Sequence, residues 1–163
     1  SIAPRHAIHP FFSGLLEGAL ITGACIFCLV LLGSLLSAPA RIYAEQLRAI
    51  TTGDLTAAID QWRQDWESRD TERLLRHYSA SFRSGSQDLQ TFGASKQKVN
   101  AAKSWIKVGL SNVSLMLYPE RRDFALVSFV QDYQSNNLND RTAKRQFWSR
   151  ENGRWKIIHE TSL

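Results

Sequence analysis

Residues 124–161 read FALVSFVQDYQSNNLNDRTAKRQFWSRENGRWKIIHET, and the spacing of apolar side chains in this stretch decides the fold. Apolar and polar residues alternate through 124–134, 142–150 and 155–161, which predicts three β-strands. Asn152 and Gly153, between the last two runs, favour a type I′ hairpin turn. A further alternating run over 110–118 is joined to the first by the polar turn 120–123. The four runs predict an antiparallel meander.

The region before these strands has helical periodicity. Leu55, Ile59, Trp62 and Trp66 recur at steps of four, three and four residues, so they share one face of a helix over 54–67. We expect residues 51–54 to separate this helix from a helical stalk over 41–53, with Thr52 or Asp54 as its N-cap.

Two shorter helices are predicted next. One is capped by Asp70 or Thr71 and turns Leu74, Leu75 and Tyr78 inward. The other starts at Ser95, and its predicted inward residues are Val99, Ala102 and Ile106. Three helices followed by an antiparallel meander predict an α+β domain, with the helices packed on one face of the sheet.

An uncharged apolar stretch precedes the domain at 18–40. As a helix that rises about 1.5 Å per residue, it would extend roughly 34 Å, enough to cross a bilayer. We predict a transmembrane helix at 18–40, with 1–17 as a cytoplasmic segment. The expected helix contacts are the small residues Gly18, Gly23, Cys25, Cys28 and Gly33.

Cleavage of this stretch as a secretory signal is the alternative, because Ala38-Pro39-Ala40 has the small residues that a signal peptidase requires. The stretch is longer than a usual signal core, so an uncleaved signal anchor is preferred. Arginines lie on both sides of it and leave the orientation open. We choose a single-pass protein of the bacterial inner membrane, with its C-terminal domain in the periplasm.

The charge balance narrows the classes of partner. The formal net charge is +5, and the basic residues are spread along the chain. This distribution favours acidic protein surfaces or anionic lipid headgroups, and it argues against nucleic acid, for which no basic run or RNA-binding aromatic motif is present. Cys25 and Cys28 are interpreted as packing residues, so the folded domain contains no cysteine.

The order of elements and several spaced residues resemble the nuclear-transport-factor-2-like family over 54–163. The matching positions are Trp62-x-x-x-Trp66-x-x-x-Asp70, Leu74-x-x-x-Tyr78-x-x-x-Phe82, Ala125-x-Val127-x-Phe129-x-Gln131-x-Tyr133 and Gly153-Arg154-Trp155-Lys156-Ile157. They look most like the branch found as a stand-alone envelope domain or fused behind L,D-transpeptidases. The resemblance implies a cone of three helices packed on a strongly curved antiparallel sheet.

The family contains ketosteroid isomerases and many non-enzymes, so the fold does not settle catalysis. Asp132 and Tyr133 are adjacent on a strand and point to opposite faces, and His159 lies near the C-terminus on a strand expected at the sheet edge. His77, beside the inward Tyr78, is expected to point outward. We therefore predict a domain without catalytic residues, cofactor or metal.

Three functions remain open. The first is a non-catalytic accessory or scaffold subunit of a membrane complex, whose partners are transmembrane subunits and whose interaction surface includes Arg121 and Arg122. The second is an envelope module that forms a homodimer through the sheet or binds a peptidoglycan-related ligand, and the third is a small-molecule isomerase or hydratase. The candidate pocket-lining residues are Trp62, Trp66, Tyr78, Asp132, Trp148 and His159.

Overall fold

The computed structural model of the chain describes the backbone of residues 13–163 and the side chains of residues 38–163. The elements are, in order, α1 (Ser13–Glu67), α2 (Thr71–Leu75), β1 (Tyr78–Ser84), β2 (Gln87–Asp88), α3 (Leu89–Ala101), β3 (Ile106–Leu117), β4 (Phe124–Ser135), β5 (Asn139–Glu151) and β6 (Arg154–Ser162). The chain divides into two units, Ser1–Leu47 and Arg48–Leu163. The second unit holds the sheet and its core.

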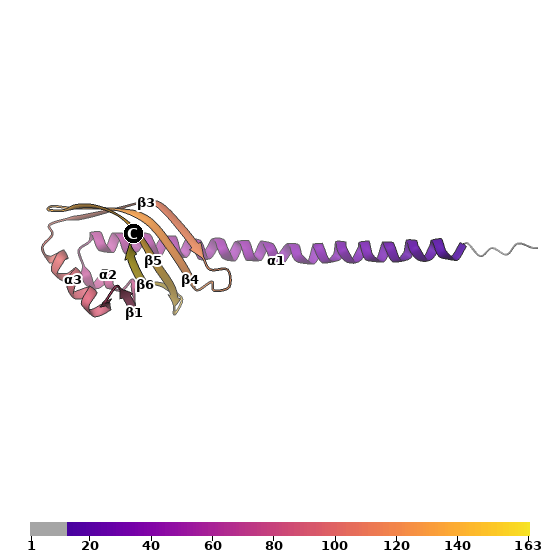
Figure 1. The fold of residues 1–163 in the computed structure, drawn as a ribbon, viewed down its shortest axis with the longest axis horizontal. Helices are drawn as coiled ribbons and strands as arrows, with labels where there is room; N and C mark the ends of the chain where they lie inside the picture. Colours follow the sequence, from indigo (N-terminus) through magenta and orange to yellow (C-terminus); the bar gives the residue numbers. More distant parts are fainter. Residues whose placement is uncertain (1–12) are drawn as a thin grey trace, which may run out of the picture. The chain divides into compact units, whose positions relative to one another are not determined.

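The strands form one six-stranded sheet in the order β2-β1-β6-β5-β4-β3. Strands β3 to β6 pair antiparallel, as the alternation predicts. The sheet curves over the helices (Figure 1). The α+β class and the curved sheet are confirmed. The predicted sheet of four antiparallel strands was too small, because β1 adds to β6 in parallel and β2 adds to β1.

The turn between β5 and β6 has the geometry that its sequence predicts. Asn152 has a φ of 50° and Gly153 a φ of 77°, so both central residues are in the left-handed region. A type I′ turn requires positive φ at both positions, and asparagine and glycine adopt it with the least strain. This turn fixes where β6 begins to pair with β5.

The core lies between the C-terminal part of α1, helix α3 and the inner face of the sheet. Six aromatic residues of the core are at least nine-tenths buried: Trp62, Trp66, Tyr78, Phe82, Phe129 and Trp155. The Trp62 ring lies 5.5 Å from that of Trp66 and 5.9 Å from that of Phe129, between ring centroids. These contacts confirm that Trp62 and Trp66 lie on the inward face of their helix, as their spacing predicts.

The predicted helix break at 51–54 is wrong. Helix α1 continues through it, and the Thr52 hydroxyl donates to the carbonyl of Arg48 at 2.8 Å, as a side chain inside a helix does. Thr52 and Asp54 are therefore not N-caps. A glycine inside a helix costs roughly 1 kcal/mol, which is small beside the burial of Leu55 and Ile59 on the same helix.

The two short helices also differ from the prediction. Asp70 caps α2 as expected, since its carboxylate accepts from the amide of Arg73 at 3.0 Å, but α2 ends at Leu75 and Tyr78 belongs to β1. Helix α3 is capped by Asp88 rather than begun at Ser95.

The predicted inward face of the third helix is consequently wrong. Val99 is 44% exposed and Ala102 is exposed at the end of α3, whereas Ile106 is buried at the start of β3. A helix that begins at Leu89 presents a different face to the sheet. Phe92 and Gly93 are its buried residues, together with Asn100.

The predicted membrane segment falls mainly outside the described side chains. Its backbone is part of α1, whereas the packing of the predicted contact residues lies outside what the structure describes: Gly18, Gly23, Cys25, Cys28 and Gly33. Within the described part of the chain, no helix has the length and apolar character needed to cross a membrane.

Candidate functional site

The inner face of the sheet contains polar side chains among its aromatic ones. On β4, Phe129, Gln131 and Tyr133 alternate inward and are buried. Tyr133 packs against Trp66 of α1, with ring centroids 5.6 Å apart. The strand register places Lys144 opposite Phe129, on the same inner face.

A bulge in β6 decides which residue of its C-terminal half points inward. Trp148 pairs with Ile157, whereas the preceding residue Phe147 pairs with His159, so Ile158 is an extra residue in β6. Because the period of a strand is two, one extra residue reverses the faces that follow it. Glu160 consequently points into the core and His159 points out.

Glu160 is the centre of a buried polar cluster. Its carboxylate accepts from Lys144 Nζ at 3.0 Å and from Gln146 Nε2 at 2.8 Å. The Gln146 side-chain oxygen in turn accepts from the Trp148 indole N–H at 3.2 Å. The side chains of Glu160 and Lys144 are only 8% and 13% exposed, so this ion pair is largely shielded from water.

A second ammonium group completes the cluster. Lys96 of α3 places its Nζ 4.3 Å from the ring centroid of Trp66 and 5.3 Å from that of Phe92, in cation–π contact with both. Lys144 Nζ lies 5.9 Å from the same Trp66 ring. We call Trp66, Lys96, Lys144, Gln146 and Glu160 the Lys96 cluster.

The electrostatics of the cluster follow from burial and charge. Burial alone would raise the pKa of Glu160, but the charges of Lys144 and Lys96 and the bond from Gln146 hold that pKa below its usual value. Burial lowers the pKa of Lys96 to about 8, although the charge of Glu160 opposes this change. Burial and the charge of Glu160 raise the pKa of Tyr78.

Two polar atoms on the neighbouring strand have no hydrogen-bond partner. They are the Gln131 Oε1 atom and the Tyr133 hydroxyl, and both are fully buried. Lys96 Nζ likewise has no hydrogen-bond acceptor or ion-pair partner among the described residues, apart from its long-range attraction to Glu160. Polar groups inside folded proteins are normally paired, so Lys96 within the cluster and Gln131 and Tyr133 on the neighbouring strand have unused hydrogen-bonding capacity.

The predicted pocket-lining residues divide between the two faces of the sheet. Trp62, Trp66, Tyr78 and Trp148 are buried on the inner side. Asp132 lies on the outer face, where it pairs with Arg141 at 3.0 Å. Asp132 and the buried Tyr133 thus point to opposite faces, as expected.

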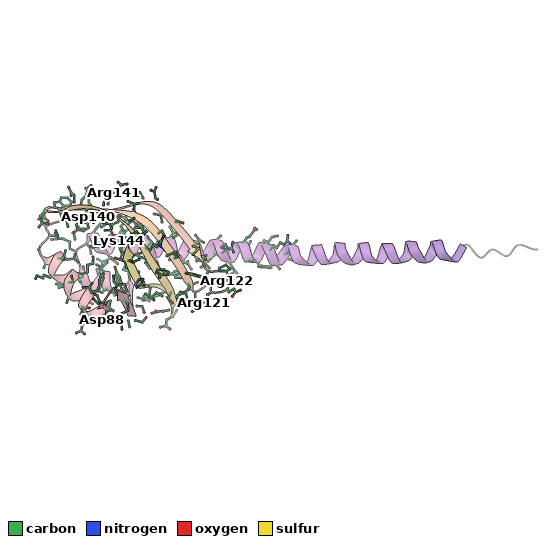
Figure 2. The ribbon with its side chains drawn as sticks, viewed as in Figure 1. Asp88, Arg121, Arg122, Asp140, Arg141 and Lys144 are labelled. Atoms are coloured by element: carbon green, nitrogen blue, oxygen red, sulfur yellow. The ribbon has the colours of Figure 1, made fainter. Side chains whose placement is uncertain are left out.

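The four remaining candidate positions lie away from the cluster. His159 packs its ring against that of Phe147 at 5.8 Å on the outer face, and its strand is internal, so the expected edge position was wrong. Arg121 and Arg122 are exposed in the turn between β3 and β4, at the opposite end of the sheet from Asp140 and Arg141 (Figure 2). His77 is half-buried and forms a hydrogen bond with the carboxylate of Asp65, so it does not point outward into solvent as expected.

Sequence analysis did not identify Lys96, Lys144, Gln146 or Glu160. One signal was present in β5, where Lys144 and Gln146 are in phase with Trp148, so two polar residues share the face of a core tryptophan. Glu160 had no such signal, because simple alternation from Ile157 points His159 inward instead. In residues 38–163, no group of three His, Cys, Asp or Glu side chains could hold a metal ion.

Comparison with known proteins places this domain in a family. The model of the Cds6 C-terminal NTF2-like domain matches residues 54–161. Bd1075 of Bdellovibrio bacteriovorus superposes with a TM-score of 0.63 at 26% identity, over 68% of this chain and 39% of that chain. No curated protein matches the chain.

Two further solved structures share the fold. The helical cell shape determining protein Pgp2 of Campylobacter jejuni has a TM-score of 0.62 at 22% identity, over 68% of this chain and 40% of that chain. An NTF2-like protein of Pseudomonas putida has a TM-score of 0.58 at 15% identity, over 68% and 83%. The chain thus spans less than half the length of Bd1075 and Pgp2. Through its residues 54–161, it belongs to the family of Cds6 C-terminal NTF2-like domains.

Proposed function

We propose that the domain is a non-catalytic envelope module that binds a peptidoglycan-related ligand at the Lys96 cluster. The observation that carries the proposal is the position of Lys96 Nζ, which lies over Trp66 without a hydrogen-bond acceptor. A half-buried ammonium is costly unless an anion pairs with it. A carboxylate of the ligand would supply that anion.

The chemistry of the cluster defines the ligand further. Lys96, Lys144 and Glu160 together carry one net positive charge, which favours an anion. The Gln131 Oε1 atom can accept an N–H, and the Tyr133 hydroxyl can donate or accept. The Trp66 ring, which contacts both Lys96 and Tyr133, offers an apolar wall. A short peptide with a free carboxylate and backbone amides matches all three requirements.

Stem peptides of peptidoglycan have this chemistry, since they are short and end in free carboxylates. The sequence resemblance to an envelope branch of the family supports this source. The likeness to a cell shape determining protein is consistent with it.

The geometry favours binding over acid–base catalysis. A general base needs a pKa near the working pH and an accessible lone pair. Glu160 has a lowered pKa, and both its oxygens accept hydrogen bonds from Lys144 and Gln146. Asp132 and His159 lie on the outer face, away from the cluster.

The test measures binding of soluble stem peptides, released from peptidoglycan by an amidase, to the full chain in mild detergent by calorimetry. Lys96→Met should weaken binding at least about tenfold, because it removes a charged hydrogen-bond donor. Lys98→Met is the matched control, since Lys98 lies two positions away on α3 and is exposed.

The ligand provides a second control. A stem peptide with its terminal carboxylate converted to an amide should bind the wild-type chain as weakly as the unmodified peptide binds Lys96→Met. Equal loss in Lys96→Met and Lys98→Met, or no saturable binding by the wild-type chain, would refute the proposal.

We also propose that two copies of the domain pair through the outer face of the sheet. This face carries the half-buried apolar side chains Leu126, Val130, Phe147 and Ile158. Light scattering of the full chain after size exclusion would give the mass, and Val130→Arg should reduce a dimer to a monomer. A wild-type monomer at micromolar concentration would contradict this proposal.

The accessory-subunit hypothesis concerns the N-terminal segment. It is supported by the uncharged stretch 18–40 and by the continuous α1, which carries this stretch and the first core residues of the domain. Native electrophoresis of gently solubilised membranes tests it, because a subunit should migrate with a large complex. Migration as an isolated monomer or dimer would contradict it.

A further inference from the structure

A groove of about 570 Å³ lies on another part of the domain. It is bordered by α1 from Asp54 to Asp65, by α2 and the residues that follow it, and by the β5–β6 turn with the start of β6. We call it the basic groove. It shares no residue with the Lys96 cluster.

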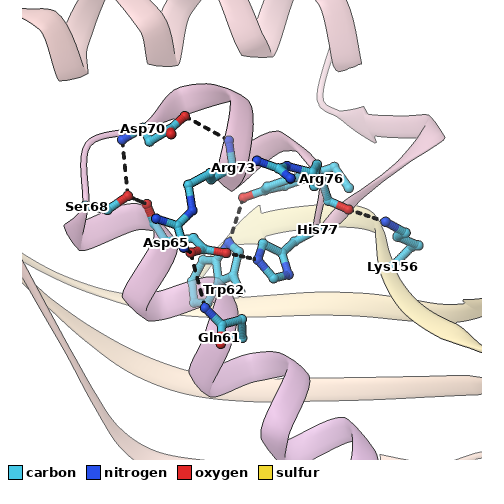
Figure 3. Close-up of polar contacts among 10 residues, drawn as sticks. Gln61, Trp62, Asp65, Ser68, Asp70, Arg73, Arg76, His77 and Lys156 are labelled. Atoms are coloured by element: carbon cyan, nitrogen blue, oxygen red, sulfur yellow. Dashed lines mark hydrogen bonds and ion pairs between the residues drawn. The ribbon is translucent and has the colours of Figure 1, made fainter.

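A buried carboxylate organises one wall of the basic groove. Asp65 is 8% exposed and accepts from His77 Nε2 at 2.7 Å and from Gln61 Nε2 at 3.2 Å. Arg73 Nη2 lies 3.4 Å from the same carboxylate. Figure 3 shows these three side chains pointing toward Asp65. These contacts with Asp65 hold His77 and Arg73 in fixed positions at the groove.

The charge of Asp65 is matched by its neighbours. Burial alone would raise the pKa of Asp65, but the hydrogen bonds from His77 and Gln61 and the nearby charges hold it below its usual value. Asp65 is therefore ionised at neutral pH and already paired with Arg73. It does not neutralise the other cations of the groove.

The remaining charges leave an excess of positive charge. Asp54, the second carboxylate at the groove, is paired with Arg150 at 3.1 Å. Lys156 donates to the backbone carbonyl of Arg76. The guanidinium groups of Arg76 and Arg154 have no hydrogen-bond or ion-pair partner among the described residues, although both line the groove. Two free guanidinium groups thus border one concave surface.

An unused neutral donor lies in the same wall. Trp155 lines the groove and is 5% exposed, and its indole N–H is buried without a hydrogen-bond partner in the described part of the chain. Buried donors of this kind are normally satisfied by protein, water or ligand.

We propose that the basic groove binds a ligand that carries a phosphate group. A phosphate presents three acceptor oxygens and a charge between about −1.5 and −2, which matches several donors that converge on one site. Guanidinium groups bind phosphate through paired hydrogen bonds, and Arg76 and Arg154 are both available for them. The phosphate can belong to a soluble molecule or to a lipid headgroup, since both present the same oxygens.

The test compares two double variants of the full chain in mild detergent. Arg76→Ala with Arg154→Ala removes the two free guanidinium groups of the groove. Arg122→Ala with Arg145→Ala is the control, because both arginines are exposed and lie outside the groove. This double substitution removes the same amount of charge. None of these four side chains has a polar contact within the described part of the chain, so the tryptophan fluorescence and thermal unfolding of both variants should match the wild type.

Pyrophosphate binding is measured by calorimetry. Headgroup binding is measured in the same detergent by titration with short-chain phosphatidic acid, and short-chain phosphatidylcholine is the comparison without a free phosphate monoester. The groove variant should lose at least about tenfold in affinity for pyrophosphate, whereas the control should change less than about twofold.

The two arms distinguish the source of the phosphate. Loss of pyrophosphate binding alone assigns the groove to soluble phosphates, and loss in both arms assigns it to headgroups as well. Equal weakening in the groove variant and the control would show a general charge effect and overturn the proposal. Absence of saturable pyrophosphate binding and of any preference for phosphatidic acid in the wild type would overturn it too.

Discussion

The buried ion pair of the Lys96 cluster gives the sharpest prediction about stability. Glu160→Gln keeps the size and shape of the side chain but removes its charge. The amide oxygen of the new side chain can accept only one of the two hydrogen bonds, and its NH2 group faces the other donor, so the variant loses one hydrogen bond and the charge that compensates Lys144 and Lys96. No cavity is created, so the change measures the polar and electrostatic contribution without a loss of packing.

The magnitude follows from burial. Removing one partner of a buried ion pair costs about 3–5 kcal/mol, because the other charge stays buried without compensation. Lys144 retains 13% exposure and gains some hydration, so we expect a loss in the free energy of unfolding near the lower end, about 3 kcal/mol. Adding Lys144→Met should recover part of this loss, with a coupling of about 1–3 kcal/mol.

The pH dependence gives an independent check. The folded-state pKa of Glu160 is lowered, so its stabilisation is fully present above the unfolded value of about 4.3. It is lost as the pH falls through the lower folded-state pKa. The difference in stability between the wild type and Glu160→Gln should therefore be large at neutral pH and shrink under strongly acidic conditions.

Urea unfolding of the full chain, followed by tryptophan fluorescence, measures these differences. All five tryptophans lie within the domain, at Trp62, Trp66, Trp105, Trp148 and Trp155, so the signal reports on its unfolding. A loss below about 0.5 kcal/mol at neutral pH would mean that the pair is effectively solvated, as surface pairs are. A difference that does not change with pH would show that the carboxylate charge is not its cause.

Three further changes test other parts of the structure. Trp66→Ala should lower the free energy of unfolding by about 3–5 kcal/mol, because it removes a buried aromatic ring, and an unchanged melting temperature would contradict its core position. The Lys96 amine should titrate near pH 8 in carbon-detected NMR of labelled lysine, and a midpoint near its ordinary value would show that it is solvated. Gly153→Ala should lower the free energy of unfolding by about 1–2 kcal/mol, because Gly153 has a positive φ. Gly53→Ala should raise it by about 0.5–1 kcal/mol, because Gly53 lies inside α1 with open space around it. Changes of the same sign in urea unfolding would contradict the assigned backbone geometry.

Much of the sheet was predictable from the sequence. Alternation over 124–161 predicts three strands, and Asn152-Gly153 predicts the last hairpin, because both signals are local in the sequence. The aromatic core was predictable for the same reason, since Trp62 and Trp66 share a helix face. Strand β2 was missed because it has only two residues, and β1 was missed because its pairing depends on β6, which lies far away in the sequence.

The helix boundaries depended on tertiary contacts as well. The sequence 51–54 contains residues that favour a break, and α1 nevertheless continues through it. Propensities of this kind amount to about 1 kcal/mol, less than the burial of one large apolar side chain on the same helix. Packing therefore decided the length of α1.

The sequence by itself determined the α+β class, the strands of the meander and the aromatic residues of the core. The tertiary structure alone decided which polar residues gather inside. One extra residue in β6 turns Glu160 inward and His159 outward, although alternation predicts the reverse. Lys96 and Lys144 then reach Glu160 and Trp66 from different elements. Register and packing set these contacts between residues distant in sequence, so no local pattern along the chain records them.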